Sequence, residues 1–100
     1  MNNGISENSI VAVSKDQVSS DLGEGEVAIL NLRGGTYYGL DAVGARIWNL
    51  LQEPKTVREI RNVLVNEYDI EPERCERDLH ALLRRLVDEG LAEVRDETTP

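Results

Sequence analysis

The residue types that most often carry catalysis are scarce in this sequence. His80 is the single histidine and Cys75 the single cysteine. They lie five positions apart on one predicted helix, about 140° round its axis, so they do not face each other. The pair forms no Cys–His nucleophile, and it offers too few ligands for a structural zinc site, because carboxylates alone rarely make one. We expect Cys75 in the core and His80 on a helix flank, with no catalytic residue, metal or cofactor.

The glycines give no phosphate-binding site either. Gly23 and Gly25, and the pair Gly34-Gly35, lie beside predicted strands. Neither group opens a helix, and neither is followed by the Gly-Lys-Ser/Thr of a phosphate-binding loop. They predict tight turns between strands. Paired carboxylates fall in loops or on solvated helix faces, so the sequence points away from an enzyme.

Composition and charge restrict the class of protein further. The chain has 100 residues, 40% of them hydrophobic, and its 11 basic and 19 acidic residues give a net charge of −8. This length fits one domain, and a lone cysteine is typical of a reducing compartment. No apolar run approaches the ~20 residues of a membrane span, and the N-terminus lacks the pattern of a signal peptide. We therefore expect a soluble cytoplasmic protein without a membrane partner.

The first half of the chain predicts three strands. Residues 17–22 are a short, mostly polar candidate, and residues 27–32 are apolar at nearly every position, as in a central strand. Residues 36–40 are rich in β-forming residues. Glycine-containing turns at 23–25 and 33–35 connect the three into an antiparallel meander, with the strand 36–40 at an edge.

The second half of the chain predicts three helices. Asp41 is a suitable N-cap for the first helix. Residues 56–59, Thr-Val-Arg-Glu, form a capping box that starts the second. The third and longest helix runs from Pro72 to about Glu89, and Gly90 is placed to end it.

Three strands followed by three helices are typical of an α+β fold that is winged helix-turn-helix-like, with the three-stranded antiparallel sheet first. Residues 91–95 are a candidate for a short strand after the last helix. We expect the domain to span residues 10–95, between flexible polar tails at residues 1–9 and 96–100.

This topology raises the question of DNA binding through the third helix. That helix carries arginines, but acidic residues four positions away are expected to pair with them. The expected pairs are Arg74–Asp78, Arg84–Asp88 and Arg85–Glu89. DNA affinity comes chiefly from neutralising phosphates, so a chain of this acidity is a poor nucleic-acid binder. A winged-helix DNA-binding or protein-interaction module in regulation remains the alternative, and a structural subunit of a larger enzyme is a third.

The edge strand suggests a different activity. It carries Tyr37 and Tyr38 without the Lys or Pro that usually protects an edge. Such an edge accepts an extended peptide as an added strand, in which backbone hydrogen bonds give affinity and side-chain pockets give selectivity. The simpler interpretation is that one tyrosine belongs to the core and the other covers surface. Alternation places Tyr38 and Leu40 on one face and Tyr37 on the other, without showing which face is buried.

Five segments, in their order and spacing, carry a resemblance to known proteins. They are 27–32 (VAILNL), 35–41 (GTYYGLD), 44–51 (GARIWNLL), 56–60 (TVREI) and 78–86 (DLxxLLxxL). Together they resemble the PqqD-like family, leader-peptide recognition elements of pathways for ribosomally synthesised and post-translationally modified peptides. The likeness covers residues 18–94 and is greatest to the free-standing form found in lasso-peptide gene clusters.

The resemblance implies a non-catalytic protein that binds the leader of a lasso-peptide precursor as an antiparallel strand, between the third strand and the third helix. In lasso systems the leader presents a Tyr and a Pro to apolar pockets, and the precursor then passes to a cysteine leader peptidase and a cyclase. Transferred to this sequence, the leader-binding residues are Thr36, Tyr37, Tyr38, Leu40, Asp78, Ala81, Leu82 and Arg85. Which helix flank faces the groove stays open, with Glu76, His80 and Leu83 as the competing choice. The acidity of the chain suggests a leader with surplus Lys or Arg.

Overall fold

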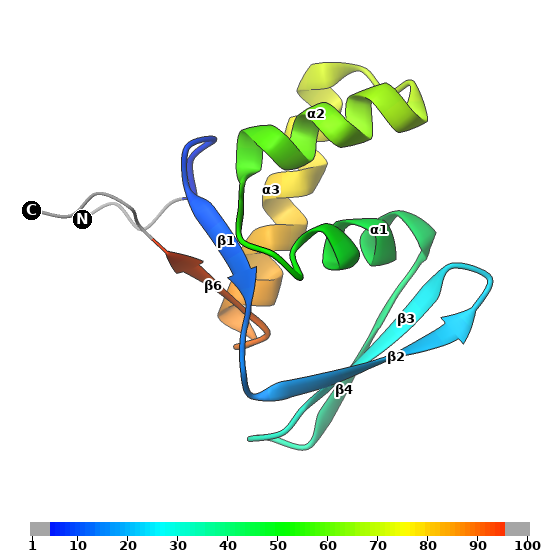
Figure 1. Cartoon of the computed structure of the whole chain (residues 1–100), viewed down its shortest axis with the longest axis vertical. Coiled ribbons are helices and arrows are strands. Elements are labelled where there is room, and N and C mark those ends of the chain that lie inside the picture. Colours follow the sequence, from blue (N-terminus) through cyan, green and yellow to red (C-terminus); the bar gives the residue numbers. More distant parts are fainter. Residues whose placement is uncertain (1–4, 96–100) are drawn as a thin grey trace, which may run out of the picture.

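The computed structural model describes residues 5–95 of the chain. Within this range the elements, in chain order, are β1 (Ile10–Val13), β2 (Gln17–Gly23), β3 (Glu26–Asn31), β4 (Thr36–Leu40), α1 (Ala42–Leu50), β5 (Lys55–Thr56), α2 (Val57–Tyr68), α3 (Pro72–Asp88) and β6 (Ala92–Arg95). Figure 1 shows the three helices gathered at one end of the molecule and the β2–β3–β4 sheet at the other.

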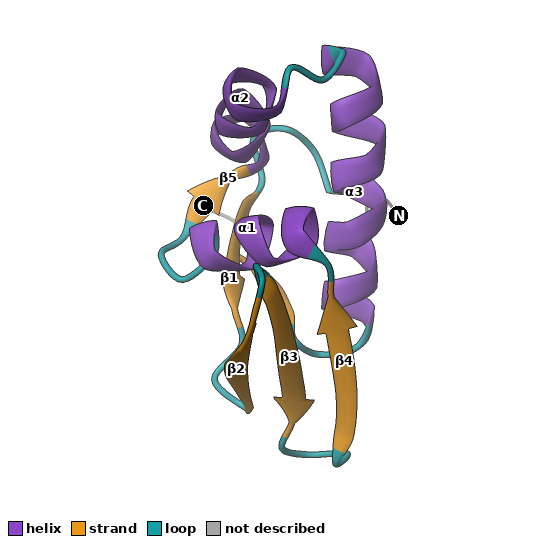
Figure 2. Cartoon of the chain, turned by 90° about the vertical axis from the view of Figure 1, so that its right-hand side faces the viewer, coloured by secondary structure: helices purple, strands orange, loops and turns teal. Residues whose placement is uncertain are grey.

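The predicted meander is the larger structural feature of the first half. Strands β2, β3 and β4 form an antiparallel sheet in that order, so β3 is central and β4 is an edge. Gly25 and Gly35, in the two connecting turns, have φ of 79° and 71°, a region that glycine enters without steric cost. Figure 2 shows β4 on the side of the sheet next to α3. The three predicted strands are confirmed to within a residue at each end.

The predicted caps position the first two helices. The Asp41 carboxylate accepts a hydrogen bond from the Gly44 N–H over 2.9 Å at the start of α1. At the start of α2 the Thr56 hydroxyl accepts from the Glu59 N–H, and the Glu59 carboxylate accepts from the Thr56 N–H, over 3.1 and 2.8 Å. These bonds satisfy amide groups that a helix leaves without internal partners. Both predicted start points are confirmed.

The third helix ends in a tight turn at Gly90, whose φ is 78°. The Leu91 N–H donates to the Leu86 carbonyl over 2.9 Å, and the Gly90 N–H to the Val87 carbonyl over 3.0 Å. This pair of bonds is the Schellman arrangement. It turns the chain back under the helix, so that Leu91 is fully buried.

A second small sheet, in the order β5-β1-β6, was not predicted as such. Its strand β6 matches the candidate strand at 91–95, but β1 and β5 were missed. Strand β5 has two residues, and β1 pairs with partners far along the chain, as in Val11 with Val94. No hairpin turn marks such pairings in the sequence. The α+β, winged helix-turn-helix-like class is confirmed, with this sheet as an addition.

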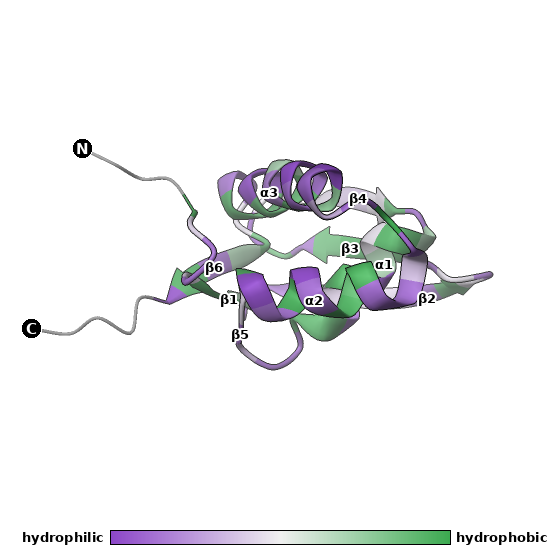
Figure 3. Ribbon diagram, turned by 90° about the horizontal axis from the view of Figure 1, so that it is seen from above, coloured by the Kyte–Doolittle hydropathy of each residue, from purple (hydrophilic) through white to green (hydrophobic). Residues whose placement is uncertain are grey.

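The core joins the sheet to the helices. Most of its largest fully buried side chains come from β3, α1, α2 and α3, and they include Ile29, Trp48, Ile60, Leu79 and Leu83. Burial of each such side chain contributes roughly 1.5–3 kcal/mol. Seen from above in Figure 3, α2 and α3 show alternating hydrophilic and hydrophobic bands, as amphipathic helices packed on one side do.

Part of the predicted N-terminal tail is described, whereas the predicted C-terminal tail is not. Residues 5–9, which the sequence placed in the N-terminal tail, bond to the start of α2: the Arg58 and Val57 N–H groups donate to the Glu7 and Ser9 carbonyls over 3.0 and 3.1 Å. The rest of the predicted tails, 1–4 and 96–100, lies outside the described residues. Among the described helices, none has the length and apolar character needed to cross a membrane.

Candidate peptide-binding site

A hydrogen bond in the β3–β4 turn shows which backbone N–H and carbonyl groups of β4 point toward β3 and which point to the open edge. The Gly35 N–H donates to the Asn31 carbonyl over 2.7 Å, so that carbonyl points toward β4. Asn31 is paired with Thr36, and in an antiparallel ladder the pairs that exchange bonds alternate with pairs that do not. The backbone groups of Thr36, Tyr38 and Leu40 therefore face β3. Those of Tyr37 and Gly39 face the open edge.

The backbone groups of β4 alternate between the two edges of the strand, whereas its side chains alternate between the two faces of the sheet. Tyr38 and Leu40 pair with the buried Ile29 and Val27, and both pack against the core. Tyr37 lies on the other face and is 70% exposed. The structure thus settles which tyrosine is partly buried, a question that the alternation alone left open.

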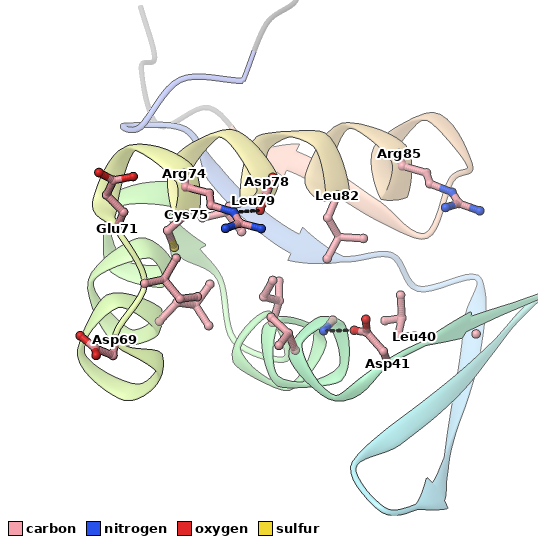
Figure 4. Close-up of a pocket in the computed structure, with 16 residues that line it drawn as sticks. Leu40, Asp41, Asp69, Glu71, Arg74, Cys75, Asp78, Leu79, Leu82 and Arg85 are labelled. Atoms are coloured by element: carbon pink, nitrogen blue, oxygen red, sulfur yellow. Dashed lines mark hydrogen bonds and ion pairs between the residues drawn. The ribbon is translucent and has the colours of Figure 1, made fainter.

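A cavity of about 750 Å³ opens at the Leu40 end of β4. It lies between the start of α1, the turn from α2 to α3, and one face of α3 (Figure 4). Its apolar lining includes Leu40, Val43, Ile47, Ile70, Leu79 and Leu82. A concave, mostly apolar space with a few charged groups is the usual form of a binding site.

The charged residues of this cavity are mostly acidic. They are Asp41, Asp69, Glu71 and Asp78, against Arg74 and Arg85. Arg74 lies 3.8 Å from Asp78 in an exposed i, i+4 pair. Figure 4 shows Asp69 and Glu71 apart from each other, both at the end of the cavity opposite Leu40 and Arg85. Three of the four acidic groups are without a described ion-pair partner within 4.0 Å, which gives the rim a negative potential.

A second, narrow cleft of about 20 Å³ continues along β4 toward its start, between Tyr38 and the end of α3. The Tyr38 hydroxyl donates a 2.6 Å hydrogen bond to the Glu89 carboxylate across it. This bond, with a smaller effect of desolvation, raises the pKa of the Tyr38 phenol, and nearby Arg85 acts weakly in the opposite direction. Tyr38 therefore stays a neutral donor throughout the physiological range.

The site has little capacity for covalent chemistry. Cys75 is one of the residues that line the large cavity, and its burial raises the pKa of its thiol above the usual value. A thiol held protonated is a poor nucleophile. In the described part of the chain, no three His, Cys, Asp or Glu side chains come together in a way that could hold a metal ion. What the arrangement offers is a strand edge and an apolar cavity beside it.

The structure brings together some of the predicted leader-binding residues. Leu40, Asp78, Leu82 and Arg85 line the large cavity, and Tyr38 lines the narrow cleft with three of them, Leu40, Leu82 and Arg85. Thr36 and Tyr37 lie on the same edge strand, outside both cavities. Ala81 is exposed on α3 and lines neither. The residues of the competing flank line neither cavity: Glu76 and His80 are half-buried elsewhere on α3, and Leu83 is fully buried.

Two of the three ion pairs expected on the third helix are wrong. Arg74–Asp78 is present, but Arg84–Asp88 and Arg85–Glu89 are not among the ion pairs of the described residues. The helical spacing does bring Arg85 and Glu89 to one side of α3. The Glu89 carboxylate instead accepts the Tyr38 hydroxyl, a tertiary partner that spacing along one helix cannot reveal.

Sequence reasoning missed several residues of the site. Arg74 and Glu89 share a helical face with Asp78, Leu82 and Arg85, because all five follow one another at intervals of three or four residues. That periodicity was a usable signal. The contribution of the α2–α3 turn, through Asp69, Ile70 and Glu71, had no such signal, because it depends on how α2 packs on α3.

Comparison with known families agrees with this geometry. The model of the family described as coenzyme PQQ synthesis protein D (PqqD) matches residues 26–92, which is more than half of the chain. The chain belongs to the PqqD family. The family resemblance predicted from the sequence is thereby confirmed. A search of curated protein sequences gives no match.

Three solved structures are similar to this PqqD-family chain. TbiB1 in complex with the TbiA(beta) leader peptide is 42% identical, with a TM-score of 0.78, and 86% of this chain and 99% of that chain are covered. Lasso peptide synthetase B1 complexed with the leader peptide is 25% identical, with a TM-score of 0.74 and coverage of 83% and 96%. The PqqD truncation of Methylobacterium extorquens PqqCD, described as a stand-alone recognition element, shares the fold at 20% identity, with a TM-score of 0.73 and coverage of 90% and 95%.

Proposed function

We propose that this PqqD-family chain is a non-catalytic recognition protein for the leader of a lasso-peptide precursor. The domain at residues 10–95 binds the leader as an additional antiparallel strand along β4 and presents the precursor to a cysteine leader peptidase of the same pathway. The observation that carries the proposal is the open edge of β4 next to an apolar cavity of about 750 Å³. Two similar structures, TbiB1 and lasso peptide synthetase B1, are complexes with leader peptides, which supports it.

The geometry gives this strand addition a direction. The N–H and carbonyl groups of Tyr37 and Gly39 supply the hydrogen bonds to the incoming strand. An antiparallel leader runs opposite to β4, so its N-terminal part lies at the Leu40 end, over the large cavity. Leader side chains on the Tyr38 and Leu40 face point toward Leu82 and enter the cavity, while the alternate ones lie beside Tyr37.

The charge of the cavity favours a basic leader. The chain carries a net charge of −8, and Asp69 and Glu71 at the cavity rim add a local negative potential. Complementary charges accelerate encounter more than they raise final affinity. We therefore propose that Lys or Arg residues of the leader, in its N-terminal part, approach this rim.

The same proposal includes two further points: the protein is located in the cytoplasm, and it is not an enzyme. Cys75, the one cysteine of the chain, is a buried free thiol whose raised pKa is unfavourable for catalysis. A protein that keeps one unpaired cysteine is suited to a reducing compartment. The peptidase is then expected to act on a precursor that this domain holds.

The proposal is tested with the precursor encoded beside this chain. A short precursor, a cysteine protease and a cyclase are expected in neighbouring reading frames. A fluorescent leader from that precursor should bind saturably in an anisotropy titration, and a scrambled leader should not. A random DNA duplex at low salt is the second arm, because even non-specific DNA binders gain affinity there. Duplex binding tighter than leader binding would favour the winged-helix regulator instead.

A further inference from the structure

The two walls of the peptide groove come from distant parts of the chain and meet at one residue. Strand β4 forms one wall and α3 the other, and the narrow cleft between them is lined by Tyr38, Leu82, Arg85 and Glu89, among others. The Tyr38 hydroxyl donates to the Glu89 carboxylate over 2.6 Å. Glu89 thus connects the walls at the narrow end of the groove, whereas the opposite end widens into the large cavity.

Glu89 is itself held firmly. It is the C-cap residue of α3, and its N–H donates to the Arg85 carbonyl over 3.0 Å. The residues after it form the Schellman turn, in which Leu91 is fully buried. Its backbone is therefore anchored to the core, and a bond to its side chain fixes the position of whatever donates that bond.

A second bond ties the β3–β4 hairpin to the same residue. The Asn31 side-chain amide donates to the Glu89 carbonyl over 3.0 Å, and the Asn31 side-chain oxygen accepts from the Arg33 N–H over 2.9 Å in the loop. The Asn31 backbone carbonyl accepts the Gly35 N–H. The loop that leads into β4 and the strand itself are consequently both attached to Glu89.

We infer that Glu89 is a positioning residue for leader binding. Through Tyr38 and Asn31 it holds β4 at a fixed distance from α3 before the leader arrives, so that the leader meets a groove of the right width. Fixing a site in its bound form raises affinity, because less order has to be imposed on binding. This inference rests on the proposed leader-binding function, and Glu89 acts on the leader through Tyr38 and the hairpin, without contact to it.

The test compares variants that separate the hydrogen bond from charge and from general stability. Glu89→Ala removes the acceptor, Tyr38→Phe removes the donor while keeping the ring, and Glu89→Gln keeps an acceptor oxygen without the charge. Glu67→Ala is the matched control, because it deletes a comparable exposed bridge: Glu67 pairs with Arg46 over 2.7 Å and joins α1 to α2, and neither residue lines a cavity. The probe is a fluorescent TbiA(beta) leader peptide, followed by anisotropy, with thermal unfolding measured for each variant.

We expect Glu89→Ala and Tyr38→Phe each to weaken leader binding by about five- to tenfold, the size of one lost hydrogen bond to a charged group reduced by exposure. The double variant should bind no more weakly than either single variant, since both remove the same bond. Glu89→Gln should stay within about twofold of the unchanged protein, and Glu67→Ala should leave affinity unaltered. Equal losses in Glu89→Ala and Glu67→Ala, or additive losses in the double variant, would overturn the inference.

Two further outcomes keep this inference separate from the proposed function. If Glu89→Gln binds as weakly as Glu89→Ala, the carboxylate attracts the leader by charge and the positioning role is wrong. If the unchanged protein binds neither this probe nor the leader encoded beside it, the proposed function is at fault, and the positioning role is then tested by amide hydrogen exchange of the free protein. In that experiment, Glu89→Ala should accelerate exchange of the Tyr38 and Leu40 amides, whereas Glu67→Ala should not. Unchanged exchange in Glu89→Ala would overturn the positioning role.

Discussion

The bond from the Gly35 N–H to the Asn31 carbonyl, 2.7 Å long, determines which amides of β4 are free. Because Asn31 faces β4, its paired residue Thr36 faces β3, and alternation assigns the open edge to Tyr37 and Gly39. The two adjacent tyrosines of this strand therefore differ in their surroundings. Tyr37 has its backbone N–H and carbonyl on the open edge, and Tyr38 donates its side-chain hydroxyl to Glu89.

Proline at Tyr37 should abolish binding of the leader. Proline removes one N–H of the open edge, and its ring obstructs the approach of a second strand. The β3–β4 ladder uses the amides of neighbouring residues and should persist. We expect affinity to fall at least tenfold in an anisotropy titration, about 1.4 kcal/mol or more, with circular dichroism close to that of the unchanged protein.

Two controls sharpen this experiment. Tyr37→Ala keeps the N–H and should retain most of the affinity. Ser19→Pro places proline on the opposite edge of the sheet, where alternation from the Val18–Leu30 pair turns the Ser19 amide outward. Ser19→Pro should not change the affinity for the leader. Equal losses in Tyr37→Pro and Ser19→Pro would contradict strand addition at β4.

Adjacent leucines on α3 should separate binding from stability. Leu82 is half-buried and lines the cavity, whereas Leu83 is fully buried in the core. Leu83→Ala should lower the free energy of unfolding by about 2–5 kcal/mol in a urea titration. Leu82→Ala should cost less stability and weaken leader binding more. If the two variants exchange these roles, the assignment of the groove to this flank of α3 is wrong.

Much of this fold could be predicted because its signals are local. The Thr56–Glu59 capping box and the Gly90 helix end each occupy a few consecutive residues, and both are confirmed. Strand β1 was missed because its partners lie far along the chain and no turn joins them, as with Val11 and Val94. Local patterns specify where an element begins and ends more readily than what it packs against.

In the candidate site, too, local patterns predicted the helix but not the partners of its side chains. The sequence left open whether the Leu82 flank or the Leu83 flank of the third helix faces a groove, and only the packing of the folded chain shows that Leu82 lines a cavity while Leu83 is buried. Likewise, helical spacing paired Arg85 with Glu89, and the structure pairs Glu89 with Tyr38. Side chains at an element boundary have partners of similar energy within and beyond their helix, and the tertiary fold decides between them.

The acidic rim of the cavity should affect the rate of leader association. Asp69 has φ of 52°, a conformation that asparagine also tolerates, so Asp69→Asn removes charge with little backbone strain. With Glu71→Gln it should slow association of a basic leader several-fold at low salt, and the difference should shrink above about 0.15 M salt. Stopped-flow fluorescence measures both rates. An effect on dissociation alone, or none on salt dependence, would contradict electrostatic attraction by this rim.

Matched charge removal away from the cavity is the control for this effect. Asp21 is exposed on β2, lines neither cavity and is in none of the ion pairs of the described residues. Asp21→Asn changes the net charge by one, as Asp69→Asn does, and keeps the side-chain oxygen that accepts the Gly23 N–H. Long-range attraction by total charge alone would make the two variants equal. We expect the rim variant to slow association more, because a charge near the docking strand acts over a shorter distance.

The phenol of Tyr38 should titrate above the ordinary range for tyrosine. Its hydrogen bond to Glu89 is the largest cause of the raised pKa, since ionisation would both break the bond and set two negative charges together. A raised pKa in the folded state means that the bond contributes stability below the unfolded pKa of about 10 and loses it as pH rises through the folded value. Subtracting the ultraviolet titration of Tyr38→Phe from that of the unchanged protein isolates this group among the three tyrosines. In a Glu89→Gln background the isolated titration should move toward lower pH; if it does not move, the Tyr38–Glu89 bond is absent in solution.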